Sequence, residues 1–105
     1  MSKPTFSSRS FLELLVMKLI RRVPEPANHI HKRMNALGYK APIGTLYALI
    51  HDLVHDGLVE HSIDEIDAGE PRRCCFLTEK GRHALTSLEK EWAKLNKTVR
   101  RAEEG

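Results

Sequence analysis

The chain has 105 residues, of which 41% are apolar, 30% charged and only 6% aromatic, so it forms one domain with an aliphatic core and is too apolar for a disordered chain. The net charge of +3 permits a polyanionic partner, although residues 58–70 form an acidic segment with no Lys or Arg. No apolar run could span a membrane and no secretory signal is visible, so we expect a cytoplasmic protein without membrane contact.

The first expected helix runs from about Phe11 to Arg22. Ser10 and Glu13 have the spacing of a capping box, in which each side chain accepts a hydrogen bond from the backbone N–H of the other residue. Val23 and Pro24 end the helix. Its apolar residues form a wide stripe, which predicts a mostly buried helix: Phe11, Leu12, Leu14, Leu15, Val16, Leu19 and Ile20.

Two shorter helices follow, each stopped by a glycine. Apolar residues at spacings of three and four predict a helix from Ala27 that ends at Gly38 and another from Ile43 that ends at Gly57. The stripe of the third helix consists of Leu46, Leu49, Ile50, Leu53 and Val54. On a helical wheel this stripe leaves an opposite face made of Gly44, Ala48, His51 and His55, with Tyr47 at its margin.

After Gly57 the period changes to two, which is typical of β-strands. We expect a hairpin whose strands begin near Leu58 and Arg72 and whose turn lies at Asp67–Gly69. Arg72 and Arg73 alternate along the second strand, so only one of them can face a given partner.

The last expected helix is capped by Thr78 and runs from Glu79 to about Arg101. Its apolar residues repeat at three and four, which is a heptad seam and predicts homodimerisation through this helix. The alternative is that the helix folds back onto its own domain. The expected dimer interface is Leu85, Leu88, Trp92, Leu95 and Val99.

The cysteines and histidines give no strong chemical signal. Cys74 and Cys75 are adjacent, which suits neither a disulfide framework nor a zinc site; we expect one of them in the core, with an oxidation sensor as the alternative. The pairs His51 with His55 and His29 with His31 could each share a metal, but no further ligand completes a set. We therefore expect no metal, no cofactor and no enzymatic activity.

Three stretches together resemble the PadR family of transcriptional regulators: Gly44-Thr45-Leu46-Tyr47, Gly57-Leu58-Val59, and Pro71-Arg72-Arg73 leading to Leu77-Thr78-Glu79-Lys80-Gly81. The resemblance implies a mainly α fold with a small β-hairpin, a winged helix-turn-helix followed by a long C-terminal dimerisation helix. We place an N-terminal arm at 1–10, the DNA-binding domain at 11–78 and the dimerisation helix at 79–105.

The family resemblance further implies a dimeric repressor whose third helix enters the major groove of DNA. The expected contacts are Lys40, Pro42, Thr45, Tyr47, Ala48, His51, Arg72 and Arg73. In the alternative, Tyr47 packs beneath the β-hairpin, which is the wing of the fold, and His51 is exposed to solvent without contacting DNA. The acidic wing tip, with Asp64, Glu65, Asp67 and Glu70, would be repelled by DNA, so we expect the base of the hairpin to make the contact.

Trp92 is the only tryptophan, and the resemblance implies a site for a small aromatic effector that stacks on it; the alternative is a plain interface anchor. The sequence thus predicts a regulator that binds double-stranded DNA at a palindromic operator as a homodimer. One rival is a winged-helix module that binds protein within a larger assembly. A second rival is a metal-responsive regulator that uses His51 and His55.

Overall fold

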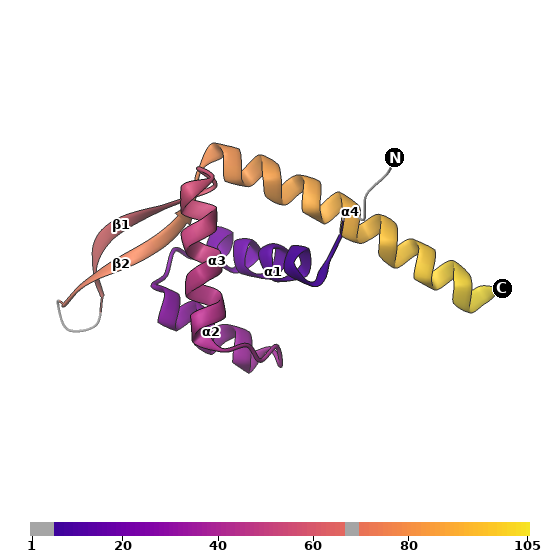
Figure 1. The fold of residues 1–105 in the computed structure, drawn as a ribbon, viewed down its shortest axis with the longest axis horizontal. Helices are drawn as coiled ribbons and strands as arrows, with labels where there is room; N and C mark the ends of the chain where they lie inside the picture. The colour runs from indigo at the N-terminus through magenta and orange to yellow at the C-terminus, as the bar shows by residue number, and fades with distance from the viewer. Residues whose placement is uncertain (1–5, 67–69) are drawn as a thin grey trace.

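The computed structural model describes residues 6–66 and 70–105, with side chains except at 64–66 and 70–72. Its elements follow the expected order of three helices, a hairpin and one long helix, which is the winged helix-turn-helix arrangement. In Figure 1 the first three helices pack together, the hairpin extends to one side, and the long helix leaves on the other. The elements are α1 (Ser8–Arg22), α2 (Ala27–Ala36), α3 (Ile43–His55), β1 (Val59–Ile66), β2 (Glu70–Leu77) and α4 (Glu79–Glu104).

Helix α1 begins about one turn earlier than the sequence predicts. Its N-cap is Ser7, whose hydroxyl accepts from the backbone N–H of Ser10, while the Ser10 hydroxyl accepts from the Ser7 N–H. The predicted capping box of Ser10 and Glu13 is therefore wrong. Glu13 instead forms an ion pair with Arg9, 3.1 Å away and one turn back on the same helix.

Helices α2 and α3 have the predicted limits. Gly38 and Gly57 follow them with φ angles of +93° and +78°, the left-handed conformation that glycine adopts without a steric cost. Pro26 and Pro42 occupy the N-cap positions in extended conformation, so each helix starts directly after a proline. Both helices bury one stripe: Ile30 and Met34 of α2, and Leu46, Leu49, Ile50 and Leu53 of α3.

Strands β1 and β2 form the expected antiparallel hairpin. The register pairs Val59 with Leu77 at the base and Ile63 with Arg73 farther out. Strand β2 begins at Glu70, two residues before the predicted start. The predicted turn at Asp67–Gly69 lies outside the described residues, as do the side chains of Asp64, Glu65, Glu70 and Arg72.

The core is aliphatic, as the composition predicts, and it also includes sulfur. Cys74 and Cys75 are both about 1% exposed, although neighbouring residues of a strand point to opposite faces. Cys75 belongs to the main cluster with Val59, Leu77 and the buried residues of the helices. The expectation that only one cysteine is buried is wrong, because the inner part of β2 is covered on both faces.

Helix α4 is capped as predicted, with the Thr78 hydroxyl accepting from the Gly81 N–H at 2.9 Å, and it continues three residues beyond the expected end. Its first turns pack on the domain, and Glu89 forms ion pairs with Lys18 and Arg21 of α1 at 3.0 and 3.3 Å. Leu85 is fully buried in the core of its own chain, so its assignment to a dimer interface is wrong. Among the described helices, α4 included, none is both long and apolar enough to cross a membrane.

Candidate nucleic-acid interface

The face of α3 opposite the core is open to solvent. Burial of Leu46, Leu49, Ile50 and Leu53 fixes the rotation of the helix, so Gly44, Ala48 and His51 point outward. Gly44 has open space where a side chain would be, and Ala48 adds only a methyl group. A narrow, smooth helix face of this kind can approach a flat or grooved surface closely.

The six residues predicted as contacts in and before α3 are all exposed. Tyr47 retains 51% of its surface and the side chain of His51 retains 81%. Tyr47 is therefore half-exposed, and its covered part adjoins the wing, with which it lines a common cavity. The exposed set is Lys40, Pro42, Thr45, Tyr47, Ala48 and His51.

A cavity of about 500 Å³ joins this face to the wing. Tyr47 and His51 line it from α3, and Arg73 lines it from β2. Strand β2 therefore brings Arg73, one of the two predicted arginines, to the open side of α3. The side chain of Arg72 is not among those that the structure describes. The remaining lining residues are Pro26, Ala27, Asn28, Ile50, Val54, His61 and Cys75.

His61 is a member of this group that the sequence did not single out. Its pKa is lowered, first by partial burial and then by the positive charge of Arg73. His61 is therefore mainly neutral near pH 7, and Arg73 supplies the fixed charge of the wing side. Strand alternation could have found His61, since it pairs with Cys75 on the same face as Arg73.

On its other side α3 adjoins the start of α1. Arg9 Nη2 lies 3.1 Å from Asp52 Oδ2 of α3, and the guanidinium pKa is raised by its hydrogen bonds to Glu13 and Asp52. A second cavity, of about 420 Å³, is lined by Arg9 together with Thr45 and Ala48. Arg9 thus ties α1 to the exposed helix, a connection across 43 residues that no local pattern predicts.

The pattern of the "Transcriptional regulator PadR-like family" matches residues 16–87, which is more than half of the chain. The chain belongs to the PadR-like family. It is accordingly a PadR-family transcriptional regulator with a DNA-binding winged-helix fold. Among curated proteins, none matches the chain.

Solved PadR-like structures agree with this assignment. A PadR-like transcription factor from Bacteroides fragilis is 33% identical, with a TM-score of 0.75 over 90% of this chain and 92% of that one. A PadR-like regulator from Bacillus cereus is 20% identical, with a TM-score of 0.87 over 92% and 95%. Bacillus subtilis PadR, solved in complex with operator DNA, is 18% identical, with a TM-score of 0.64 over 73% of this chain and 45% of that one.

Trp92 of this PadR-like chain lies in an aromatic cluster. Its ring centroid is 5.8 Å from that of Phe6 and 5.7 Å from that of Phe11, which in turn contacts Tyr39 at 5.5 Å. The indole nevertheless keeps 42% of its surface exposed. Its free area could accept a second copy of the chain or an aromatic ligand.

Three histidines of this PadR-like chain have local partners. His31 Nε2 lies 2.6 Å from the Ala41 carbonyl oxygen, a contact that joins α2 to the segment before α3. His51 and His55 each lie near the aspartate that follows them, at 3.7 and 3.5 Å. Among the side chains that the structure describes, which exclude those of 64–72, no three His, Cys, Asp or Glu residues gather as a metal site would require.

Proposed function

We propose that this regulator binds double-stranded DNA in a sequence-specific manner, with α3 in the major groove, and represses transcription from a palindromic operator as a homodimer. The observation that carries the proposal is the open face of α3, where Tyr47 and His51 share a cavity with Arg73 of the wing. A reading helix and a basic wing residue on one side are what a winged helix needs to contact bases and backbone together.

The residues divide between the two kinds of contact. Tyr47 and His51 extend from the exposed face and reach base edges, while Gly44 and Ala48 let the helix enter the groove. Lys40 and Thr45, near the start of α3, hold phosphates, and Pro42 fixes where that helix begins. Arg73 holds a further phosphate from the base of the hairpin.

Dimerisation takes place through the part of α4 that leaves the domain. Leu95 and Val99 keep 42% and 59% of their surface exposed, and together with Leu88 and Trp92 they form a continuous apolar stripe. A two-fold axis through this stripe relates two α3 helices, which enter successive major grooves about 34 Å apart. Repression then follows from steric occupation of the operator, in the cytoplasm, without any catalytic step.

The Bacillus subtilis structure supports the proposal at the level of the fold, since that PadR was solved with operator DNA. An aromatic effector that stacks on the exposed part of Trp92 would lie beside the dimer axis. It would relieve repression by changing the spacing of the two α3 helices. Quenching of Trp92 fluorescence by planar aromatic compounds, with Trp92→Phe as the blank, tests this part separately.

Fluorescence anisotropy with a labelled duplex at increasing salt tests the main proposal. Binding should weaken steeply with salt, because each phosphate contact releases counterions. Absence of any duplex binding at low salt would overturn the proposal and favour the rival, a winged-helix module that binds protein. A change of DNA affinity on adding zinc that His51→Ala and His55→Ala abolish would favour the metal-responsive rival.

A further inference from the structure

The wing cavity, as we term the cavity of about 500 Å³ between α3, the start of α2 and the hairpin, has one apolar side. Ile50 and Cys75, which are 4% and 1% exposed, form the part of its wall that belongs to the core. The half-buried Ala27 and Val54 extend this apolar wall on α2 and α3. A volume of this size lies within the range of sites for small organic ligands, about 300 to 1,000 Å³.

Three polar side chains of the wing cavity have no partner in the part of the chain that the structure describes. Asn28 lines the cavity from α2, His61 from β1 and Arg73 from β2. None of these three side chains forms a hydrogen bond or an ion pair with another described residue. The cavity therefore combines an apolar wall with hydrogen-bond donors and a positive charge that are still unpaired.

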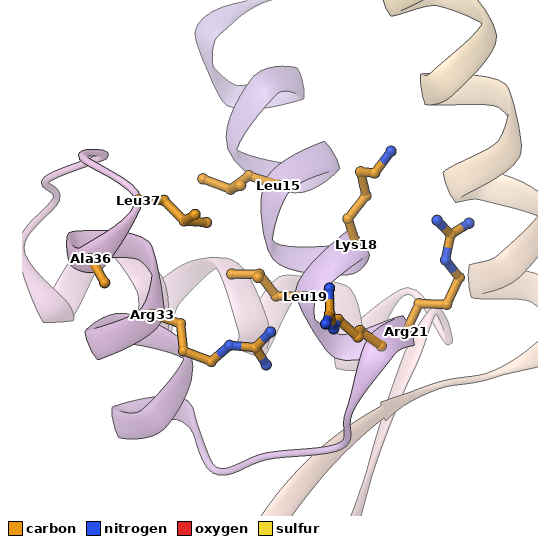
Figure 2. Close-up of a pocket in the computed structure, with 8 residues that line it drawn as sticks. Leu15, Lys18, Leu19, Arg21, Arg33, Ala36 and Leu37 are labelled. Carbon is orange, nitrogen blue, oxygen red and sulfur yellow. The ribbon is translucent and has the colours of Figure 1, made fainter.

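The basic side chains around the groove between α1 and α2 differ in this respect. That groove, of about 650 Å³, is shown in Figure 2, where Lys18 and Arg21 extend toward the α4 side. Both of them pair with Glu89, and Arg33 pairs with Glu25 at 2.6 Å. Three of the four cations of that groove are thus neutralised within the chain, whereas the arginine of the wing cavity has no such pair among the described residues.

An anionic ligand with an apolar body matches both sides of the wing cavity. A carboxylate accepts two hydrogen bonds from the fork of a guanidinium, and a neutral imidazole and a carboxamide each offer a further N–H. Arg73, His61 and Asn28 are these three groups. The body of the ligand covers Ile50 and Val54, which removes hydrocarbon surface from water. A cationic ligand would be repelled by the arginine, and a wholly apolar one would leave the donors unpaired.

A ligand in the wing cavity and DNA on α3 exclude each other, a step that rests on the proposed function. Tyr47 and His51, which we propose to reach base edges, line this cavity, and Arg73 is the proposed phosphate contact of the wing. One guanidinium fork cannot hold a carboxylate and a phosphate at the same time. Each of the two ligands therefore lowers the affinity for the other by the same factor.

We propose that the wing cavity binds a small carboxylate with an apolar chain, which Arg73 holds by its charged end, and that this ligand displaces DNA. The chain of the ligand lies on Ile50 and Val54. The site is separate from the exposed face of Trp92, which belongs to α4 and does not line the wing cavity. A ligand here acts on each subunit alone by covering the reading face, without a change in the spacing of the two subunits.

Octanoate is the probe, and NMR titration of the full, isotope-labelled chain locates where it binds. The Arg73 side-chain N–H and the Val54 amide should show saturable shifts, with a dissociation constant of about 1 mM for a ligand of about ten non-hydrogen atoms. Octanamide, the uncharged analogue, and the variant Arg73→Gln should each weaken binding about tenfold. Arg22→Gln, the matched control at the α1–α2 groove, should leave octanoate binding unchanged.

Val54→Phe fills the wing cavity without altering a proposed DNA contact. It should abolish the octanoate shifts and keep the duplex affinity of the original chain. In the original chain, octanoate at about ten times its dissociation constant should weaken duplex binding about tenfold, against the same concentration of sodium acetate. In Val54→Phe it should have no such effect. Ala27→Phe fills the cavity from the α2 side and should behave identically, and circular dichroism shows that each variant folds.

The outcomes separate this inference from the proposed function. Equal binding of octanoate and octanamide would overturn the role of the charge, and unchanged binding to both cavity-filling variants would overturn the site. Loss of binding in Trp92→Phe or Arg22→Gln instead would place the ligand elsewhere and also overturn it. Octanoate that shifts Arg73 and Val54 without displacing duplex would contradict the exclusion of DNA. If the original chain binds no duplex, the proposed function fails, while those shifts would still confirm the carboxylate site.

Discussion

The α-carbon of Gly81 lies directly against the carbonyl group of Leu58, where the entry to β1 meets the first turn of α4. The Leu58 oxygen also accepts from the Thr78 N–H at 3.1 Å, and the Thr78 hydroxyl donates to the Gly57 carbonyl oxygen. This contact holds the base of the wing to the base of the long helix. It fixes how the DNA-reading part is oriented relative to the part proposed to dimerise.

Gly81→Ala should therefore destabilise the fold strongly. A Cβ at this position would collide with the Leu58 backbone, which cannot move without breaking the Thr78 hydrogen bond. We expect the free energy of unfolding to fall by about 3 kcal/mol, measured by chemical denaturation. Gly44→Ala is the matched control: its Cβ would enter open space, so stability should be retained. Equal stability of both variants would contradict the close approach at Gly81.

Arg73→Ala should weaken operator binding without loss of stability. Its side chain is exposed and lines the same cavity as Tyr47 and His51, so its loss removes one phosphate contact per subunit. The slope of log affinity against log salt should then fall by about one per subunit. Lys90→Ala, on the far side of α4, should change neither quantity.

The same salt titration of DNA affinity with Arg72→Ala shows which of the two neighbouring arginines contributes more to DNA binding. Strand alternation leaves only one of them for the DNA side, and we expect it to be Arg73. A larger loss of affinity for Arg72→Ala than for Arg73→Ala would reverse this assignment.

Leu95→Asp should convert the dimer to monomers. The leucine is 42% exposed in one chain, and an aspartate in its place would be buried without a partner in the dimer. Sedimentation velocity at micromolar concentration should show a single species near 12 kDa. The control is Lys94→Asp, which changes the net charge by more than Leu95→Asp does but lies off the stripe, so this variant should remain dimeric. If Leu95→Asp is also dimeric, the stripe is not the interface.

Removal of the Glu89 charge should cost stability only where that carboxylate is ionised. Hydrogen bonds from Lys18 and then Arg21 lower the Glu89 pKa despite some desolvation. Because the folded-state pKa is lowered, the ionised Glu89 stabilises the fold fully at pH values above its unfolded-state pKa of about 4.3. This stabilisation is lost as the pH falls through the lower folded-state pKa.

Glu89→Gln should accordingly lower the free energy of unfolding by about 0.5 to 1 kcal/mol at pH 7, and the difference should shrink below about pH 4. Denaturation at fixed protein concentration measures it, with the exposed Glu104→Gln as a control that shows no such pH dependence. A difference that persists unchanged at pH 3 would indicate a packing effect instead.

The two thiols should react slowly in the folded protein. Burial first, and the neighbouring Cys74 second, raise the pKa of the Cys75 thiol to about 11, and both side chains are about 1% exposed. At pH 8 almost none of Cys75 is in the reactive thiolate form, and burial shields both thiols from the reagent. Labelling with a disulfide reagent should reach two thiols per chain only after denaturant is added. Rapid native labelling would support the oxidation-sensor interpretation.

Short-range patterns in the sequence predicted the elements well. The glycines at 38 and 57, the Thr78 cap and the buried stripe of α3 act within one or two helical turns, so they could be inferred before any tertiary contact was known. The same stripe placed Tyr47, Ala48 and His51 on the open face. Those residues follow from helical periodicity alone.

Two kinds of feature could not be predicted: the choice between competing local caps, and contacts between distant segments. Helix α1 has two serines able to cap it, and the choice of Ser7 over Ser10 is a local competition that spacing does not decide. Cys74 and Leu85 are buried because other elements cover them, which neither the strand alternation nor the heptad reveals. The ion pair of Arg9 with Asp52 is likewise a product of tertiary packing.

Selection of bound duplexes from a random pool tests the central claim most directly. If two copies joined through α4 each place one α3 in a major groove, the recovered sequences should share a palindrome with half-site centres about 10 base pairs apart. Tyr47→Ala should recover a weaker consensus at the same spacing. Recovery of a single half-site without symmetry, or of no enriched sequence at low salt, would contradict the account.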